Sequence, residues 1–158
     1  MPTNQFTMQD PRSQYQMGRT EKDSDQPDPG LDEILKPKAD HGEDTYVGSD
    51  RLKGRKALIT GGDSGIGRAV AIAFAREGAD VVINYLASEE ADAKETLDIL
   101  KASGNKAWGI AGDISDENFC NDLVAQSVEN LGSIDILVNN AGKQQFAAIV
   151  DDLSARQF

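Results

Sequence analysis

Residues 56–67 read KALITGGDSGIG, and this stretch decides the fold. Its apolar part, residues 57–60, predicts a buried strand, and the amphipathic stretch after the glycines predicts a helix. In the turn between them, Gly61 would allow a sharp bend, Gly65 the close approach of a ligand, and Gly67 tight packing of the helix on the strand. Backbone N–H groups at a helix N-terminus bind phosphate, so this turn predicts a pyrophosphate site.

The glycines follow the spacing TGxxxGxG, which differs from the commoner GxGxxG spacing of dinucleotide-binding turns. A strand, the turn and a helix stand in that order, and a second strand and helix follow. This context favours nucleotide binding over a purely structural glycine loop. The hydroxyl of Ser64 would either bind the phosphate or cap the helix, and the sequence leaves both roles open.

From residue 51 onward, short apolar runs alternate with amphipathic stretches, which is typical of a parallel sheet covered by helices. Further strands are predicted at residues 81–85, 106–110 and 134–138. The fold class is therefore α/β, a Rossmann-type doubly wound parallel sheet. Its first four strands are expected in the order 3-2-1-4, incomplete, with the fourth as an open edge.

The helices are expected to begin at polar residues and to turn apolar stripes towards the sheet. Ser88 and Ser115 are the predicted N-caps of the second and third helices. The residues predicted to share a buried face are Ile66, Val70, Ala73 and Phe74 in the first helix and Cys120, Val124, Ser127, Val128 and Leu131 in the third.

Residues 1–50 contain all five prolines and little apolar periodicity. We therefore predict an extended polar tail over residues 1–50 and a nucleotide-binding domain over residues 51–158. A solvated tail is the simpler interpretation. Alternatively, an apolar turn near residues 31–35 would dock on the domain, or Tyr46 and Val47 would lie against a partner surface.

The net charge of −11 argues against nucleic acid and anionic membranes as partners. One nucleotide held by backbone amides remains compatible with that charge. Cys120 is the only cysteine, which indicates a reducing compartment. Because no apolar run reaches signal-peptide or membrane-spanning length, we expect a cytoplasmic protein without a membrane or metal partner.

Three motifs in register resemble the short-chain dehydrogenases/reductases: TGGDSGIG at residues 60–67, Asp113-Ile114 after the third strand, and NNAG at residues 139–142. Residues 27–86 are also similar to a bacterial subgroup with extended N-termini, described as glucose/ribitol-dehydrogenase-like, general stress oxidoreductases or aldehyde reductases. The resemblance implies an NAD(P)-dependent oxidoreductase acting on a small aldehyde, ketone or polyol.

The resemblance implies a cofactor site built from four segments. These are Gly61, Asp63, Ser64, Gly65, Ile66 and Gly67 in the glycine turn, Asn84 and Tyr85 ending the second strand, Asp113 and Ile114 after the third, and Asn139, Ala141 and Gly142 after the fourth. Asp113 would accept a hydrogen bond from the adenine amino group, with helix capping as the alternative. Asn139 would tie neighbouring strands together, with or without touching the cofactor.

Cofactor choice depends on the end of the second strand, where sites that select NAD usually carry an acid. Asn84 and Tyr85 stand there, and the next acid is Glu89. Arg68 is the arginine nearest to the glycine turn, and the neighbouring Asp63 works against its use for a phosphate. The sequence therefore favours NADP, with NAD or dual use left open.

The catalytic Asn, Ser, Tyr and Lys that the resemblance implies are all expected beyond Phe158. The 158-residue chain alone is therefore expected to be inactive, and the full-length form to be a homodimer or homotetramer. The alternative is a non-catalytic nucleotide-binding or regulatory fragment that associates with full-length subunits.

Overall fold

The structure, a computed structural model, describes residues 6–7 and 38–142. Within these residues, strands and helices alternate along the chain. The strands are β1 (Lys56–Thr60), β2 (Asp80–Tyr85), β3 (Ala107–Ala111) and β4 (Ile136–Val138), and the helices are α1 (Gly65–Arg76), the short 3-10 helix η2 (Ala87–Glu89), α2 (Glu90–Ala102) and α3 (Glu117–Leu131). None of the described helices is both long and apolar enough to cross a membrane.

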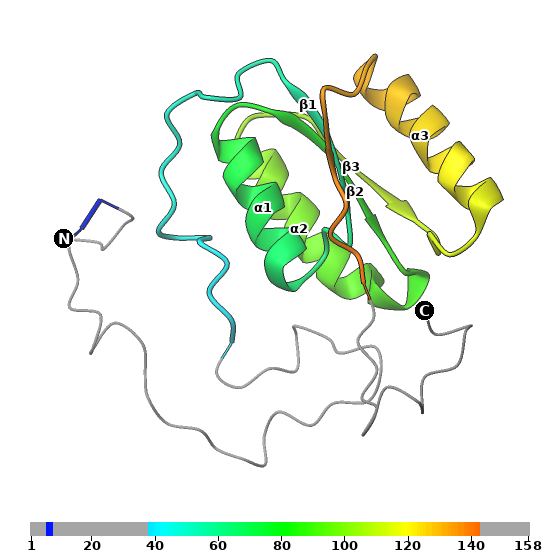
Figure 1. The fold of residues 1–158 in the computed structure, drawn as a ribbon. Coiled ribbons are helices and arrows are strands. Elements are labelled where there is room, and N and C mark those ends of the chain that lie inside the picture. The colour runs from blue at the N-terminus through cyan, green and yellow to red at the C-terminus, as the bar shows by residue number, and fades with distance from the viewer. Residues whose placement is uncertain (1–5, 8–37, 143–158) are drawn as a thin grey trace, which may run out of the picture.

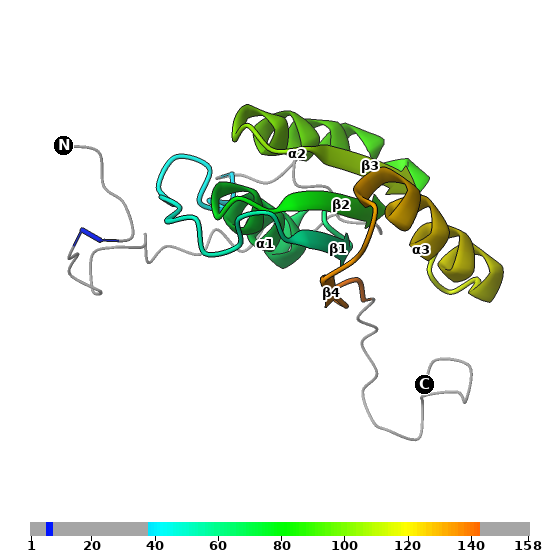
Figure 2. The same cartoon turned by 90° about the horizontal axis from the view of Figure 1, so that it is seen from above.

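The four strands form one parallel sheet in the order β3-β2-β1-β4, which confirms the predicted fold class and strand order. Helices α1 and α2 cover one face of the sheet and α3 covers the other (Figure 1). Alternate residues of β2 serve the two faces, because Val81 and Ile83 pack towards α1 and α2 while Val82 packs towards α3. Strand β4 lies at the edge beside β1 (Figure 2), and its Leu137 is exposed.

The buried face of helix α1 is partly the predicted one, because Val70 and Phe74 are half-buried and pack against the core. Ile66 was expected in the core but is 77% exposed, and the buried apolar residues are Ala71, Ile72 and Ala75. Ile66 lies in the first turn of the helix, directly after the glycine turn. The small side chains of Ala71 and Ala75 allow the helix to approach the strands closely.

The buried stripe of α3 is Leu123, Ser127 and Leu131, so the prediction was right for Ser127 and Leu131 but wrong for Val124 and Val128, which are exposed. The three buried residues are spaced by four and therefore share one helix face. The buried Ser127 hydroxyl is satisfied within the helix, since it donates to the carbonyl oxygen of Leu123 at 2.7 Å.

Both predicted N-caps are wrong. Asp116, not Ser115, caps α3, because its Oδ1 accepts a hydrogen bond from the backbone N–H of Asn118. Ser88 lies inside η2, where Glu89 accepts from the backbone N–H of Leu86. The intervening 3-10 turn moves the start of α2 beyond Ser88.

Residues 38–50, here called the N-terminal strap, lie against the end of α1. Arg76 donates hydrogen bonds to the backbone carbonyl oxygens of Gly42, Glu43 and Tyr46. The hydroxyl of Tyr46 donates to Glu77 at 2.6 Å, so the Tyr46 side chain contacts its own domain. The apolar turn predicted near residues 31–35 lies outside the described residues.

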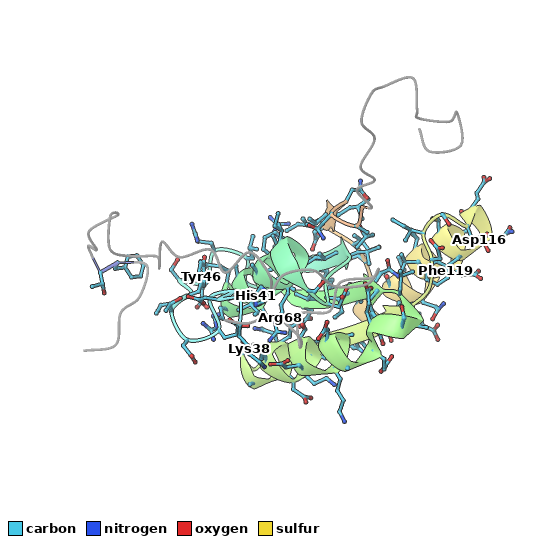
Figure 3. All side chains as sticks on the ribbon, turned by 90° about the horizontal axis from the view of Figure 1, so that it is seen from below. Lys38, His41, Tyr46, Arg68, Asp116 and Phe119 are labelled. Atoms are coloured by element: carbon cyan, nitrogen blue, oxygen red, sulfur yellow. The ribbon has the colours of Figure 1, made fainter. Side chains whose placement is uncertain are left out.

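The other end of the strap meets α1 at Arg68, whose guanidinium is buried and lies 3.1 Å from both Glu43 and Glu95. The imidazole of His41 bonds to Glu43 at 3.0 Å. Figure 3 shows Lys38, His41 and Arg68 gathered beside α1. Arg68 therefore holds the strap against α1 and α2 through these two carboxylates.

Candidate cofactor site

A cavity of about 710 Å³ opens where the carboxyl ends of all four strands meet. In an open parallel sheet, ligands bind at this edge, at the point where successive connections leave to opposite faces. Here that point lies between β1 and β4, since α1 follows β1 on one face and α3 precedes β4 on the other.

Nine of the residues predicted for the site line this cavity, and four do not. Those that line it are Gly61, Asp63, Ser64, Asn84, Tyr85, Asp113, Ile114, Ala141 and Gly142. Gly65, Ile66, Gly67 and Asn139 are not among the lining residues. Of these four, Gly65 and Gly67 are part of the glycine turn but do not line the cavity.

The glycine turn has the backbone that its sequence predicts. Gly61 and Gly65 have φ values of +61° and +51°, a region that favours glycine. A Cβ on Gly67 would overlap the carbonyl oxygen of Gly61 and lie 2.6 Å from Nδ2 of Asn140. By contrast, a Cβ on Gly65 would meet no atom within 4 Å, so open space adjoins the N-terminus of α1 at Gly65.

Asn140, not Asn139, ties β4 to the glycine turn. Its Nδ2 donates to the carbonyl oxygens of Thr60 and Gly61, both at 3.0 Å. The backbone N–H groups of Asn140 and Ala141 both donate to the Thr60 hydroxyl at 3.1 Å. Asn139 is exposed, because side chains alternate along an extended segment and only every second one faces β1.

Asn84 and Tyr85 are already engaged with the protein through their polar groups. The buried Asn84 amide donates to the carbonyl oxygens of Ile110 and Gly112 at 3.1 and 3.0 Å, and so holds the end of β3 beside β2. The Tyr85 hydroxyl donates to Glu90 at 2.9 Å. Burial, followed by that hydrogen bond, raises the pKa of Tyr85 to about 12.

Asp113 lies on the exposed turn after β3, with Oδ1 accepting from the backbone N–H of Ser115 at 2.9 Å. This bond lowers the pKa of Asp113 below its ordinary value. The hydrogen bond from Ser115 to Asp113 therefore stabilises the turn and does not cap the helix, because the N-cap of α3 is Asp116. The cavity side of the turn carries Ile114 and Ser115 as well.

Asp63 is the one fully buried carboxyl group in the cavity lining of the described residues, with 2% of its surface exposed. Its Oδ2 makes no hydrogen bond within the described part of the chain. Burial, followed by the negative charge of Glu89, raises the pKa of Asp63 to about 6. The lining contains three acids, Asp63, Glu89 and Asp113, and no lysine or arginine among the described residues.

Comparison with known proteins places the chain in a family. A family model described as "short chain dehydrogenase" matches residues 55–158. The chain therefore belongs to the short-chain dehydrogenase family of oxidoreductases.

Three curated relatives show how close the match is. An uncharacterized oxidoreductase, YhxD, of Bacillus subtilis is 57% identical over 82% of this chain and 43% of its own length. The uncharacterized oxidoreductase YghA of Escherichia coli is 51% identical over 96% of this chain and 51% of its own length. The glucose and ribitol dehydrogenase of Daucus carota is 42% identical over 79% of this chain and 45% of its own length. The chain thus spans about half the length of the curated relatives it matches.

Solved structures agree with the fold. A short-chain dehydrogenase from Burkholderia cenocepacia in complex with NADP is 41% identical, with a TM-score of 0.62 over 68% of this chain and 43% of that one. Carveol dehydrogenase from Mycobacterium avium in complex with NAD is 29% identical, with a TM-score of 0.63 over 69% of this chain and 43% of that one. Members of the family therefore bind either nicotinamide dinucleotide.

Proposed function

We propose that this chain forms the nucleotide-binding part of an NAD(P)-dependent oxidoreductase that acts on a small aldehyde, ketone or polyol. One observation carries the proposal: the glycine turn, with open space at Gly65, borders a cavity at the carboxyl edge of the sheet. The names of the relatives, which include a glucose and ribitol dehydrogenase and a carveol dehydrogenase, support this class of substrate.

The nucleotide would lie across the ends of the strands. Its pyrophosphate would sit against the turn from Gly61 to Gly67, where backbone N–H groups and the positive end of α1 stabilise negative charge. The adenine would lie over Ile114, with its amino group donating to Asp113. The ribose on the nicotinamide side would lie against Ala141 and Gly142.

The residues of this chain would bind and orient the cofactor. When bound, a nicotinamide ring supplies or accepts the hydride. Thr60 and Asn140 would keep the floor of the site rigid, because their mutual hydrogen bonds connect β1 and β4 at the switch point. The groups that move the substrate proton are expected beyond Phe158, so the 158-residue chain by itself would bind the nucleotide without turnover.

The remaining expectations about the intact protein are proposals as well. A cytoplasmic location is supported by the single cysteine, Cys120. A homodimer or homotetramer is the expected assembly. Neither the described residues nor the relatives favour the alternative of a non-catalytic regulatory fragment.

A turnover assay of the intact protein tests the reaction class. We expect NAD(P)H oxidation with at least one small aldehyde or ketone, or NAD(P)⁺ reduction with a polyol or alcohol, measured by absorbance of the reduced nicotinamide. Protein that binds the nucleotide but moves no hydride with any substrate in a broad panel would overturn the oxidoreductase proposal.

A further inference from the structure

The N-terminal strap contacts helix α1 in its first turn, next to the proposed pyrophosphate site. The buried guanidinium of Arg68 lies 3.1 Å from Oε1 of Glu43 in the strap and 3.1 Å from Oε1 of Glu95 in α2. Arg68 directly follows Gly67 of the glycine turn. Its backbone N–H donates to the carbonyl oxygen of Ser64, a residue that lines the cavity. Arg68 therefore connects the strap with the glycine turn.

A second connection to the glycine turn runs through α2. Thr96, the residue after Glu95, is buried, and its hydroxyl donates to the backbone carbonyl oxygen of Asp63 at 2.8 Å. Helices α1 and α2 contact each other along the same face of the sheet. Arg68 thus bridges two helices that are each hydrogen-bonded to the backbone of the glycine turn. Because a close-packed interior transmits displacements, a change in how Arg68 is held is expected to reach that turn.

The carboxylate of Glu43 is itself held in one orientation by the strap. Its Oε1 bonds to Nδ1 of the His41 imidazole at 3.0 Å, and its Oε2 accepts from the His41 backbone N–H at 2.8 Å. Arg76, in the last turn of α1, donates to the Tyr46 carbonyl oxygen at 2.6 Å. The strap is therefore fixed to α1 at both ends of the helix, and Figure 3 shows His41 between Tyr46 and Arg68.

The two carboxylates around Arg68 differ in their exposure. A buried guanidinium depends on its counter-charges, because an unpaired charge in a protein interior is costly. The Glu43 side chain is 24% exposed and the Glu95 side chain 45% exposed. Loss of the Glu43 charge is therefore expected to draw Arg68 away from the strap, towards Glu95 and solvent.

We infer that the N-terminal strap is a positioning element of the nucleotide site. Glu43 is its positioning residue: it fixes Arg68, and through Arg68 it holds the first turn of α1 and the glycine turn in the conformation that binds the pyrophosphate. By linkage, a bound nucleotide stabilises the strap in turn. The inference rests on the proposed function, since it requires a nicotinamide dinucleotide in the cavity.

Titration calorimetry of the intact protein with NAD⁺ and with NADP⁺ tests the inference. Glu43→Gln keeps the shape of the side chain and removes its charge. It is expected to raise the dissociation constant of the nucleotide that the wild-type protein binds by about fivefold or more. The matched control is Asp44→Asn, which removes the neighbouring, exposed carboxylate of the strap. This control should bind the nucleotide as the wild-type protein does.

A double-mutant cycle distinguishes positioning through Arg68 from a general loss of stability. Arg68→Met removes the guanidinium and should weaken nucleotide binding at least as much as Glu43→Gln does. In the Arg68→Met background, Glu43→Gln should cause no further loss, because its carboxylate acts through the guanidinium. Additive losses would mean that Glu43 acts by another route and would overturn the inference.

Hydrogen exchange of the wild-type protein needs no substitution, so it decides the question even if a variant fails to fold. The backbone N–H of Tyr46, which donates to the Gly42 carbonyl oxygen at 3.1 Å, reports on the strap. Strap N–H groups should exchange several-fold more slowly with saturating nucleotide than without it. Equal exchange rates in the two states would overturn the coupling.

The outcomes separate the two proposals. Nucleotide binding of equal affinity in wild type, Glu43→Gln and Asp44→Asn would overturn the role of the strap and leave the oxidoreductase proposal standing. Failure of the folded wild-type protein to bind either nucleotide would overturn both.

Discussion

Replacing Gly67 by alanine is expected to destabilise the protein by about 3 kcal/mol or more and to abolish nucleotide binding. The added Cβ would overlap the carbonyl oxygen of Gly61, which is backbone and cannot rotate away. Helix α1 would have to move off β1, and the hydrogen bonds from Asn140 to Thr60 and Gly61 would be strained with it. Chemical denaturation and nucleotide titration of the same variant measure the two effects.

Gly104→Ala is the control for this change. Gly104 follows α2 with a φ of +86°, and a Cβ there would meet no atom within 4 Å. The cost is expected to be about 1 kcal/mol, from backbone strain alone, with nucleotide binding unchanged. If Gly67→Ala behaved like Gly104→Ala in both measurements, the close contact between α1 and the glycine turn would not be needed.

The second large effect is expected at Glu77, which fastens the N-terminal strap to the domain. Its carboxylate is 4% exposed and accepts hydrogen bonds from the Tyr46 hydroxyl, the backbone N–H groups of Ser49 and Arg51, and the Arg51 guanidinium. The bonds from Arg51 and Tyr46 hold the pKa of Glu77 far below its ordinary value of 4.5. Glu77→Gln should therefore lower the melting temperature clearly at pH 7.

The pH dependence of that effect has a defined sign. A carboxyl group whose pKa is lower in the folded state stabilises the protein above its unfolded pKa, and the contribution is lost as the pH falls. The difference in melting temperature between wild type and Glu77→Gln should be full at pH 7 and shrink as the pH falls below about 4.5. Glu129→Gln, at an exposed position of α3, should show no such difference. A difference in melting temperature between wild type and Glu77→Gln that does not change with pH would contradict this role of the Glu77 carboxylate.

The fold could be predicted because the relevant signals are local. Each strand is a short apolar run, and each connection carries a helix with a glycine at or just past its end, such as Gly78, Gly104 and Gly132 with positive φ. The alternation predicts a parallel sheet, and the order 3-2-1-4 is the one expected of the Rossmann-type fold that the glycine turn after the first strand indicates.

The details that failed depend on contacts between distant segments. Residues 139 and 140 are both asparagine, so the sequence does not show which of them contacts Thr60. The pairing of β4 with β1 determines that it is Asn140. The exposure of Ile66 depends on what the first turn of α1 packs against in the folded domain. The spacing of apolar residues along a helix does not show whether an apolar residue in its first turn, such as Ile66, is buried or exposed.

The strap could not be predicted for a related reason. Its polar composition is typical of a solvated tail, yet its contacts are hydrogen bonds and ion pairs at Arg68, Arg76 and Glu77 and not apolar burial. Asp63 likewise gives no signal of burial in the sequence, since the turn that carries it is otherwise made of glycine and serine. The division at residue 51 stays a prediction, although residues 38–50 lie against the domain.

The most direct test of the central claim is nucleotide titration of the intact protein in three forms: wild type, Gly65→Ala and Gly104→Ala. Both glycines have positive φ and open space at the Cβ position, so the two substitutions strain the backbone similarly, but only Gly65 adjoins the proposed pyrophosphate. We predict saturable binding of NAD⁺ or NADP⁺ to wild type and Gly104→Ala, with dissociation constants between about 1 μM and 1 mM, and loss of binding in folded Gly65→Ala. Equal binding by all three forms, or binding by none while all are folded, would contradict a nucleotide site at this turn.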